Sequence, residues 1–177
     1  AGGWGAVGGT VYGNPTPISG TEDDELYQSH RWWHDSGGYA ATVPNGTYQI
    51  TIKFAELYPW AIVGSRVFDV RIEGVLMRAN ADVMAAAGKY SAYDLTFSNV
   101  AVADGNLTLD LLSRVGAPAL NAVEIVQLGG GGGTPAVTAT PTATPAATPV
   151  RGDTLFRVNA GGSAYIDRQG EFWSADQ

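Results

Sequence analysis

The stretch TYQITIKFAE, residues 47–56, alternates large apolar side chains with polar ones. Its apolar positions are Tyr48, Ile50, Ile52 and Phe54. Because successive side chains of a β-strand point to opposite faces, this pattern predicts a strand with one face in a hydrophobic core. The turn signal PNG at residues 44–46 comes just before it and predicts that residues 39–43 form a hairpin with this strand.

The same alternation recurs on both sides of this stretch. It appears in residues 66–73 and again in residues 107–111, which follow an Asp-Gly turn signal. Residues 92–100 and 122–128 are further short strand candidates, and only residues 82–87 favour a turn or two of helix. Short strands at roughly ten-residue spacing are typical of a sandwich or a barrel. The sequence therefore predicts an all-β protein, an antiparallel β-sandwich.

Composition excludes several classes of function. Of the 177 residues only 15% are charged, and the net charge is −7 with ten Lys and Arg, which argues against nucleic-acid binding. There is no cysteine, hence no disulfide and no thiolate metal site. The sequence contains no run of 18 apolar residues, so no membrane span is predicted, and no leader peptide is recognisable. We expect a secreted protein in its mature form, extracellular or on the cell surface.

The composition changes sharply at residues 129–153. Five glycines are followed by a tract of Thr, Pro and Ala, which predicts a hinge and then an extended linker. The tract supplies candidate sites for O-linked sugars, namely Thr134, Thr138, Thr140, Thr142, Thr144 and Thr148. Asn45 and Asn106 begin Asn-x-Thr sequons within predicted turns and are candidate sites for N-linked glycans.

The end of the chain has the sequence of a domain's beginning. Residues 154–177 contain NAGGSAY and WSADQ, and WSADQ would continue directly into AGGWGAVGGTVYG at residues 1–13. With this tail moved to the front, the chain resembles malectin and the malectin-like carbohydrate-binding domains. The matching strings include GTEDDELYQSHRW at 20–32, PNGTYQITIKFAELY at 44–58, RVFDVRIEG at 66–74 and NAVEIV at 121–126. Residues 1–128 thus correspond to a malectin-like sandwich that lacks its first strand, and residues 154–177 to that strand and loop.

The resemblance implies an antiparallel jelly-roll-like β-sandwich, completed by the C-terminal segment of the same or a neighbouring chain, whose loops bind carbohydrate at one end. It does not imply an enzyme, and no cofactor is expected. In the family, an aromatic trough holds glucose-containing disaccharides, and the positions that match it here are Tyr12, Trp32 and Tyr58. The aromatic residue expected after Tyr58 is replaced by Pro59, and Trp60 is the candidate substitute. An acidic residue expected near the last strand falls at Gly116, so the site lacks that acceptor.

Other site chemistry has weaker support in the sequence. The acidic run at residues 22–25 has no spacing typical of a calcium loop, and a turn explains it. His30 and His34 are four apart outside any predicted helix, and no third ligand is apparent, so no metal site is predicted. Glu56, Asp69 and Glu73 do not form a recognisable glycosidase pair, so the prediction is a protein that is not an enzyme.

The permuted order leaves three arrangements open. The tail can close its own chain's sandwich, belong to a tandem repeat, or be donated to the next copy as a strand. Each requires the tail to bury apolar side chains, for which the candidates are Phe156, Val158, Tyr165 and Phe172. The first hypothesis is therefore a structural unit that assembles head to tail with copies of itself into an extracellular filament. The alternative is a carbohydrate-binding module for glucose-containing oligosaccharides, with glycans as partners.

Overall fold

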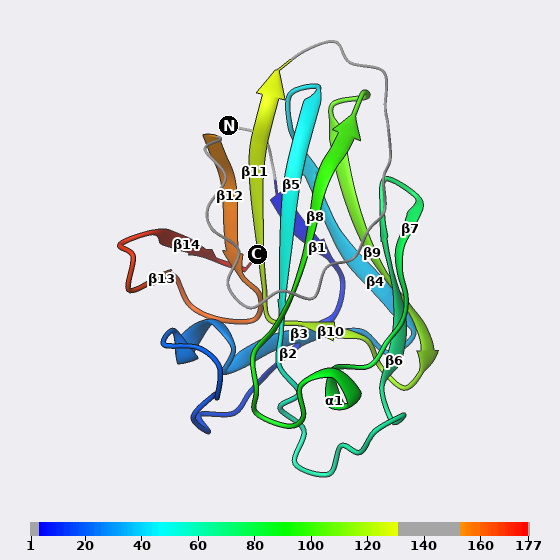
Figure 1. Ribbon diagram of the computed structural model, residues 1–177, viewed down its shortest axis with the longest axis vertical. Coiled ribbons are helices and arrows are strands. Elements are labelled where there is room, and N and C mark those ends of the chain that lie inside the picture. Colours follow the sequence, from blue (N-terminus) through cyan, green and yellow to red (C-terminus); the bar gives the residue numbers. More distant parts are fainter. Residues whose placement is uncertain (1–3, 131–152, 177) are drawn as a thin grey trace.

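The computed structural model describes residues 4–130 and 153–176, and it is a β-sandwich (Figure 1). One sheet has five strands in the order β1-β4-β9-β6-β7, and the other has six in the order β13-β14-β12-β11-β5-β8. A small sheet, β10-β3-β2, lies across the lower end of the sandwich in this view. The strands of the five-stranded sheet are β1 (Trp4–Val7), β4 (Ser36–Thr42), β6 (Val67–Ile72), β7 (Val75–Ala81) and β9 (Asn106–Val115). Those of the six-stranded sheet are β5 (Gly46–Phe54), β8 (Tyr93–Val102), β11 (Ala122–Gly130), β12 (Asp153–Asn159), β13 (Tyr165–Ile166) and β14 (Phe172–Ala175). Those of the small sheet are β2 (Thr10–Gly13), β3 (Ser29–Trp32) and β10 (Ala119–Leu120).

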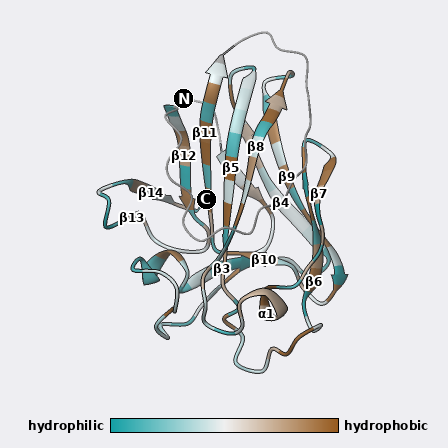
Figure 2. Cartoon of the chain, viewed as in Figure 1, coloured by the Kyte–Doolittle hydropathy of each residue, from teal (hydrophilic) through white to brown (hydrophobic). Residues whose placement is uncertain are grey.

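The core lies between the two large sheets, where the alternating strands place their apolar faces. In β5 the predicted inward residues are at most 1% exposed, and in β9 the three alternating leucines are fully buried. The brown stretches along these strands in Figure 2 follow this alternation. The all-β prediction is therefore confirmed. Burial of each large side chain contributes on the order of 2 kcal/mol, so the facing sheets stabilise each other.

The predicted hairpin between residues 39–43 and β5 is wrong. β4 pairs with β1 and β9 in one sheet, whereas β5 pairs with β8 and β11 in the other. The PNG turn therefore carries the chain across the sandwich, and the buried Tyr39 and Tyr48 belong to facing sheets. Both strands have a one-sided apolar pattern, and such strands can pair side by side or face each other across a core. Asn45 holds this crossing by donating from Nδ2 to the carbonyl oxygen of Ala103, 2.9 Å away.

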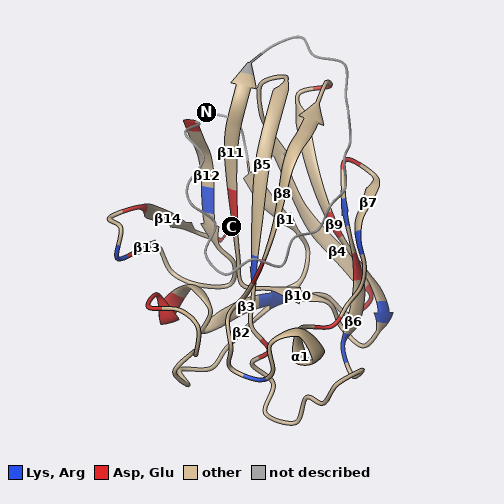
Figure 3. Cartoon of the chain, viewed as in Figure 1, with Lys and Arg blue, Asp and Glu red and all other residues tan. Residues whose placement is uncertain are grey.

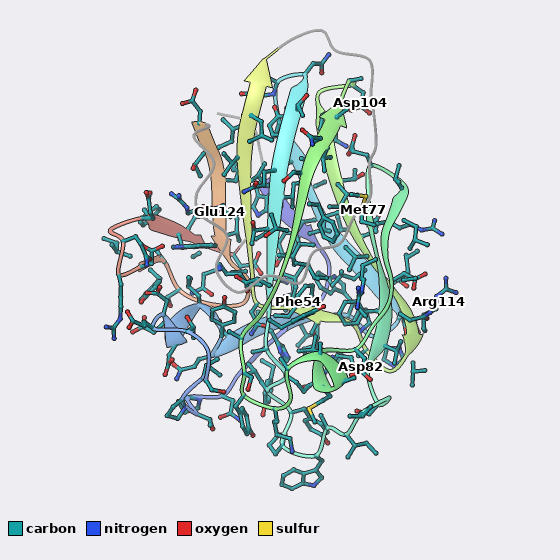
Figure 4. All side chains as sticks on the ribbon, viewed as in Figure 1. Phe54, Met77, Asp82, Asp104, Arg114 and Glu124 are labelled. Atoms are coloured by element: carbon teal, nitrogen blue, oxygen red, sulfur yellow. The ribbon has the colours of Figure 1, made fainter. Side chains whose placement is uncertain are left out.

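The predicted helical turn is present as α1 (Val83–Ala86). Asp82 is its N-cap, and its carboxylate accepts from the backbone N–H of Ala85 at 3.0 Å. In Figure 4 Asp82 lies beside α1 near the lower end of the sandwich, and Asp104 lies near the opposite end. A short 3-10 helix, η1 (Asp24–Leu26), occupies the acidic run. Among the described residues, no helix is both long enough and apolar enough to cross a membrane.

The tail lies against its own chain. β12 pairs antiparallel with β11, and β14 then runs parallel to the end of β12. Of the three arrangements, this is the one in which the tail closes its own sandwich. Asp23 also holds the tail, since its carboxylate accepts from the Tyr165 hydroxyl at 3.0 Å and the Arg168 N–H at 2.9 Å. The acidic run, which is red at the lower left of Figure 3, therefore anchors the tail loop.

The burial of the tail's apolar side chains matches the prediction for Phe156 and Val158 and differs from it for Phe172. Val158 is 1% exposed in the main core, and Phe156 is half-buried and stacks on Trp4 with ring centroids 5.8 Å apart. Phe172, however, is 60% exposed, and the neighbouring Trp173 is the buried residue at 2%. The reason is the register of β14, which pairs Phe172 with the exposed Ile166 and turns Trp173 inward. The burial predicted for Phe172 is therefore wrong by one position.

Of the predicted glycosylation positions, the structure describes the two asparagines and not the threonines. The six threonines of the linker tract lie outside the described residues. Asn45 and Asn106 are both exposed, at a turn and at the start of β9 respectively. Their modification remains a prediction.

Candidate carbohydrate-binding face

The small sheet brings two of the predicted aromatic residues together. In the register of β2 and β3, Tyr12 lies directly opposite His30, and Trp32 is two positions further along β3. Because strand side chains alternate, Tyr12, His30 and Trp32 share one face of this sheet. The rings of Tyr12 and His30 are in contact, with centroids 5.4 Å apart and planes tilted by 36°. Tyr12 and Trp32 are half-buried, so part of each ring is open to solvent.

The other two predicted aromatics lie on the segment that leaves β5, residues 57–65, which we call the aromatic loop. Tyr58 is 52% exposed and Trp60 is 75% exposed. Their ring centroids are 6.3 Å apart and their planes are tilted by 40°. Two large rings this exposed and this close to each other form an apolar surface that nothing in the described chain covers. The structure thus places Tyr58 and Trp60 close together on one exposed loop, and the substitution of Trp60 for the missing aromatic stays a prediction.

A buried ion pair fixes the start of this loop. Glu56 is 2% exposed, and its carboxylate accepts from the Tyr58 N–H at 2.9 Å and from Arg66 Nε at 2.7 Å. The Arg66 guanidinium also donates to the carbonyl oxygen of Ala117. Glu56 and Arg66 therefore join the base of the aromatic loop to the segment between β9 and β10. A buried pair of this kind is strongly destabilising to break, because the remaining charge is left without a partner.

Two further contacts hold the aromatic loop beside β2. Asn14, just after β2, donates from Nδ2 to the Leu57 carbonyl oxygen at 3.2 Å and lies 3.4 Å from the Tyr90 hydroxyl. Lys89 donates to the carbonyl oxygen of Pro59. Tyr12 packs against the cluster of buried residues that contains Leu57, so the strand of Tyr12 and the loop of Tyr58 share a core. The aromatic loop is thus held in place before any ligand arrives, which lowers the entropic cost of binding.

The position that lacks its acidic residue has a structural reason to be glycine. Gly116 has a φ of +64°, and a Cβ at this position would lie 2.4 Å from the Ser65 carbonyl oxygen. A side chain here would clash with backbone in addition to adopting a disfavoured conformation. The acidic acceptor is therefore excluded by the close approach of the two loops, as well as being absent from the sequence.

Sequence reasoning missed His30 and Arg66 as parts of this face. Burial lowers the pKa of His30 to about 3, and the charge of Arg66 acts in the same direction. Its Nδ1 has no hydrogen-bond partner among the described residues. The period-2 spacing between His30 and Trp32 is the signal in the sequence that places His30 on this face, because both side chains leave the same side of a strand. His30 is neutral at pH 7, and it supports the Tyr12 ring from within the sheet.

The structure separates the histidines and gives the acidic run a different role. His30 is buried, whereas His34 is exposed and lies 3.3 Å from Asp35. Within residues 4–130 and 153–176, no three His, Cys, Asp or Glu side chains are grouped as a metal would require. Asp23 is engaged with the tail, as described above.

The face combines exposed aromatic rings with a loop that the buried pair of Glu56 and Arg66 holds in place. Such rings suit the apolar C–H side of a pyranose, while loop backbone groups and half-buried polar side chains suit its hydroxyls.

The comparisons with known proteins agree with the fold. The Malectin domain family model matches residues 10–140. Malectin-B of Xenopus laevis is 38% identical over 86 residues, which cover 47% of this chain and 31% of that protein. Malectin of Homo sapiens is 36% identical over 86 residues, covering 47% and 29% respectively. The chain therefore spans under a third of the length of these curated relatives.

Solved structures share the fold at lower identity. The extracellular domain of ANXUR1 from Arabidopsis thaliana has a TM-score of 0.58 at 16% identity, covering 66% of this chain and 38% of that one. A β-glucuronidase of Bacteroides uniformis has a TM-score of 0.64 at 21% identity, covering 70% of this chain and 14% of that one. At such identities the likeness concerns the fold alone. With a family match over most of the described sandwich, the chain belongs to the Malectin domain family.

Proposed function

We propose that this chain is a non-catalytic carbohydrate-binding domain that recognises glucose-containing oligosaccharides. The observation that supports this most is the pair of exposed rings, Tyr58 and Trp60, on a loop that Asn14 ties to the end of β2, the strand that bears Tyr12. A pyranose that stacks on such rings loses little entropy to protein rearrangement, because the loop is already anchored.

Binding without catalysis is supported by the state of the candidate carboxylates. Glu56 is paired with Arg66, and Asp69 is 2% exposed and paired with Arg114. Hydrogen bonds from Arg114 and from the Asn80 N–H lower the pKa of Asp69. Glu73 accepts from the N–H and the hydroxyl of Thr108. A glycosidase needs two carboxyl groups that face the substrate, and all three of these are occupied in holding loops and strands together.

The head-to-tail filament has less support than the binding module. The tail lies in its own chain's sheet, where it buries Val158 and Trp173. A donated strand would have to leave these contacts and form the same ones in a neighbour, with no gain in the contacts themselves. We also propose an extracellular or cell-surface location, since ANXUR1, one of the structural relatives, is described as an extracellular domain.

The experiment is a calorimetric titration of the full chain with maltose and with longer glucose oligosaccharides. We expect binding that Tyr58→Ala weakens by about fivefold, because loss of one stacked ring removes roughly 1 kcal/mol. The control is Leu76→Ala, which removes a side chain of similar exposure, 45%, on β7. Binding that is unchanged in Tyr58→Ala, or no binding to any glucose oligosaccharide, would contradict the proposal.

A further inference from the structure

Arg31 of β3 makes polar contacts on the face of the small sheet that is opposite to Tyr12, His30 and Trp32. Arg31 lies between His30 and Trp32 on β3, so its side chain leaves the opposite face of the strand. It is paired in register with Val11 of β2 and Leu120 of β10, at the centre of the small sheet. Whatever fixes Arg31 therefore also fixes the strand whose other face presents Trp32.

The partner of Arg31 is Asp176, at the far end of the tail. Its Oδ2 accepts from Arg31 Nε at 2.5 Å, from the Tyr39 hydroxyl at 2.9 Å and from the Gly161 N–H at 3.0 Å. The Asp176 side chain is 1% exposed and that of Arg31 is 14% exposed. One buried carboxylate thus joins β3, β4 and the tail turn. Arg31 and Asp176 are 145 positions apart in the sequence.

A second nitrogen of the Arg31 guanidinium, Nη1, contacts the turn that leads into β2. This Nη1 donates to the carbonyl oxygen of Gly8 at 3.1 Å and, more weakly, to that of Gly9 at 3.4 Å. Trp33 donates from Nε1 to the Val7 carbonyl oxygen at 2.8 Å, in the same turn. Because this turn sets where Tyr12 lies, Asp176 orients both strands of the aromatic face through a single guanidinium.

The tail backbone itself supports this sheet from behind. A Cβ at Gly161 would lie 2.7 Å from the His30 carbonyl oxygen and 3.0 Å from Val11, so the tail lies directly against β2 and β3. Ser29 of β3 lies 3.4 Å from Asn159 Oδ1, at the end of β12. The tail and the candidate site therefore lie on opposite faces of one two-strand layer.

We propose that the tail is a positioning element for the carbohydrate-binding face, with Asp176 as a positioning residue that acts through Arg31. This rests on the proposed function for the identity of the ligand. Since the docked tail holds the binding face in its competent form, carbohydrate binding and tail docking stabilise each other, and by linkage the effect is equal in both directions. Strengthening the tail contacts raises affinity, and a bound carbohydrate holds the tail more tightly.

The test compares the full chain with its Asp176→Asn variant by hydrogen exchange and by maltose titration. Asparagine keeps the shape of the side chain and removes the charge. We expect the amides of β2 and β3 to exchange at least tenfold faster in the variant, those of β5 and β9 to stay protected, and affinity for maltose to fall at least tenfold. Glu171→Gln is the matched control, because it removes a half-exposed tail carboxylate that pairs with Arg157 and not with Arg31. It should leave both measurements unchanged.

A second variant covers the case in which Asp176→Asn loses its fold. Arg31→Lys keeps the charge but cannot reach Asp176 and the Gly8 turn at once, and we expect the same selective loosening of β2 and β3. In the unchanged chain, saturating maltose should slow exchange at residues 158–161. The inference is overturned if β2 and β3 exchange as before in both variants, or if all strands loosen equally. Should the unchanged chain bind no sugar, the proposed function fails, and exchange in the variants still decides whether Asp176 positions this face.

Discussion

Replacing Trp173 by alanine tests whether the tail is part of the sandwich core. Trp173 is 2% exposed and belongs to a cluster of buried residues with Ile18, Leu26, Tyr27, Ala55, Leu57 and Ala122. Its indole N–H donates to Asp167 at 2.9 Å, and Lys53 Nζ lies 5.8 Å from its ring centroid. Truncating a buried tryptophan typically costs about 3–5 kcal/mol, through lost burial and the cavity that remains. Asp167 is only half-buried, so water replaces most of its lost hydrogen bond.

We therefore expect Trp173→Ala to lower the free energy of unfolding by about 4 kcal/mol, or the melting temperature by roughly 8–16 °C for a chain of this size. Urea unfolding followed by circular dichroism measures it, since the signal does not depend on the tryptophan removed. Phe172→Ala is the control, because its neighbouring ring is 60% exposed, and it should change stability by no more than about 0.5 kcal/mol. The reasoning is refuted if Trp173→Ala costs less than about 1 kcal/mol, or if Phe172→Ala costs more than Trp173→Ala.

Three further predictions follow from the same structure. Because the folded pKa of His30 is about 3 and the unfolded value is 6.5, the unfolded chain binds the extra proton between these values. Stability should thus fall on acidification from about pH 6.5 to 3, by up to about 1.4 kcal/mol per pH unit, and His30→Gln should flatten this slope in urea unfolding. Gly116→Asp should lower the free energy of unfolding by about 2 kcal/mol or more and add no sugar affinity, because its Cβ clashes with Ser65. Light scattering on the purified chain should give a single species at 18.5 kDa, since the tail lies in its own sheet.

Each of these has an outcome that would count against it. An unchanged acid slope in His30→Gln would mean that other groups cause it. A stable Gly116→Asp protein that binds sugar more tightly would mean that the two loops can separate. A ladder of masses would favour strand donation between copies.

The fold was predictable where each strand has one buried face. The alternation in residues 47–56 predicted β5 and its inward side, and the recurring short strands predicted the sandwich. Pairing was less predictable, because β4 and β5 have the same pattern whether they are neighbours or face each other across the core. Only the contacts of distant segments, such as β4 with β9, distinguish these cases.

The aromatic candidates of the site could be named from the sequence, whereas the ion pairs that hold the surrounding strands and loop could not. The resemblance supplied Tyr12, Trp32, Tyr58 and Trp60. The structure brings the first two to one face of the small sheet and the last two to one loop, and their role in binding stays a prediction. The ion pair of Glu56 with Arg66 and that of Arg31 with Asp176 join residues that no local pattern connects. In the tail, β14 has only four residues, which is too short a strand for sequence alone to choose between Phe172 and Trp173 as the buried ring.

The most direct test of the central claim is to map backbone and indole N–H chemical shifts during a maltose titration of the isotope-labelled chain. The account predicts saturable shifts at Tyr12, Trp32 and Tyr58 and at the Trp60 indole, with smaller ones at residues 158–161 behind the small sheet. Shifts confined to another surface, or none at millimolar sugar where weak binding would appear, would contradict a carbohydrate-binding face at this end of the sandwich.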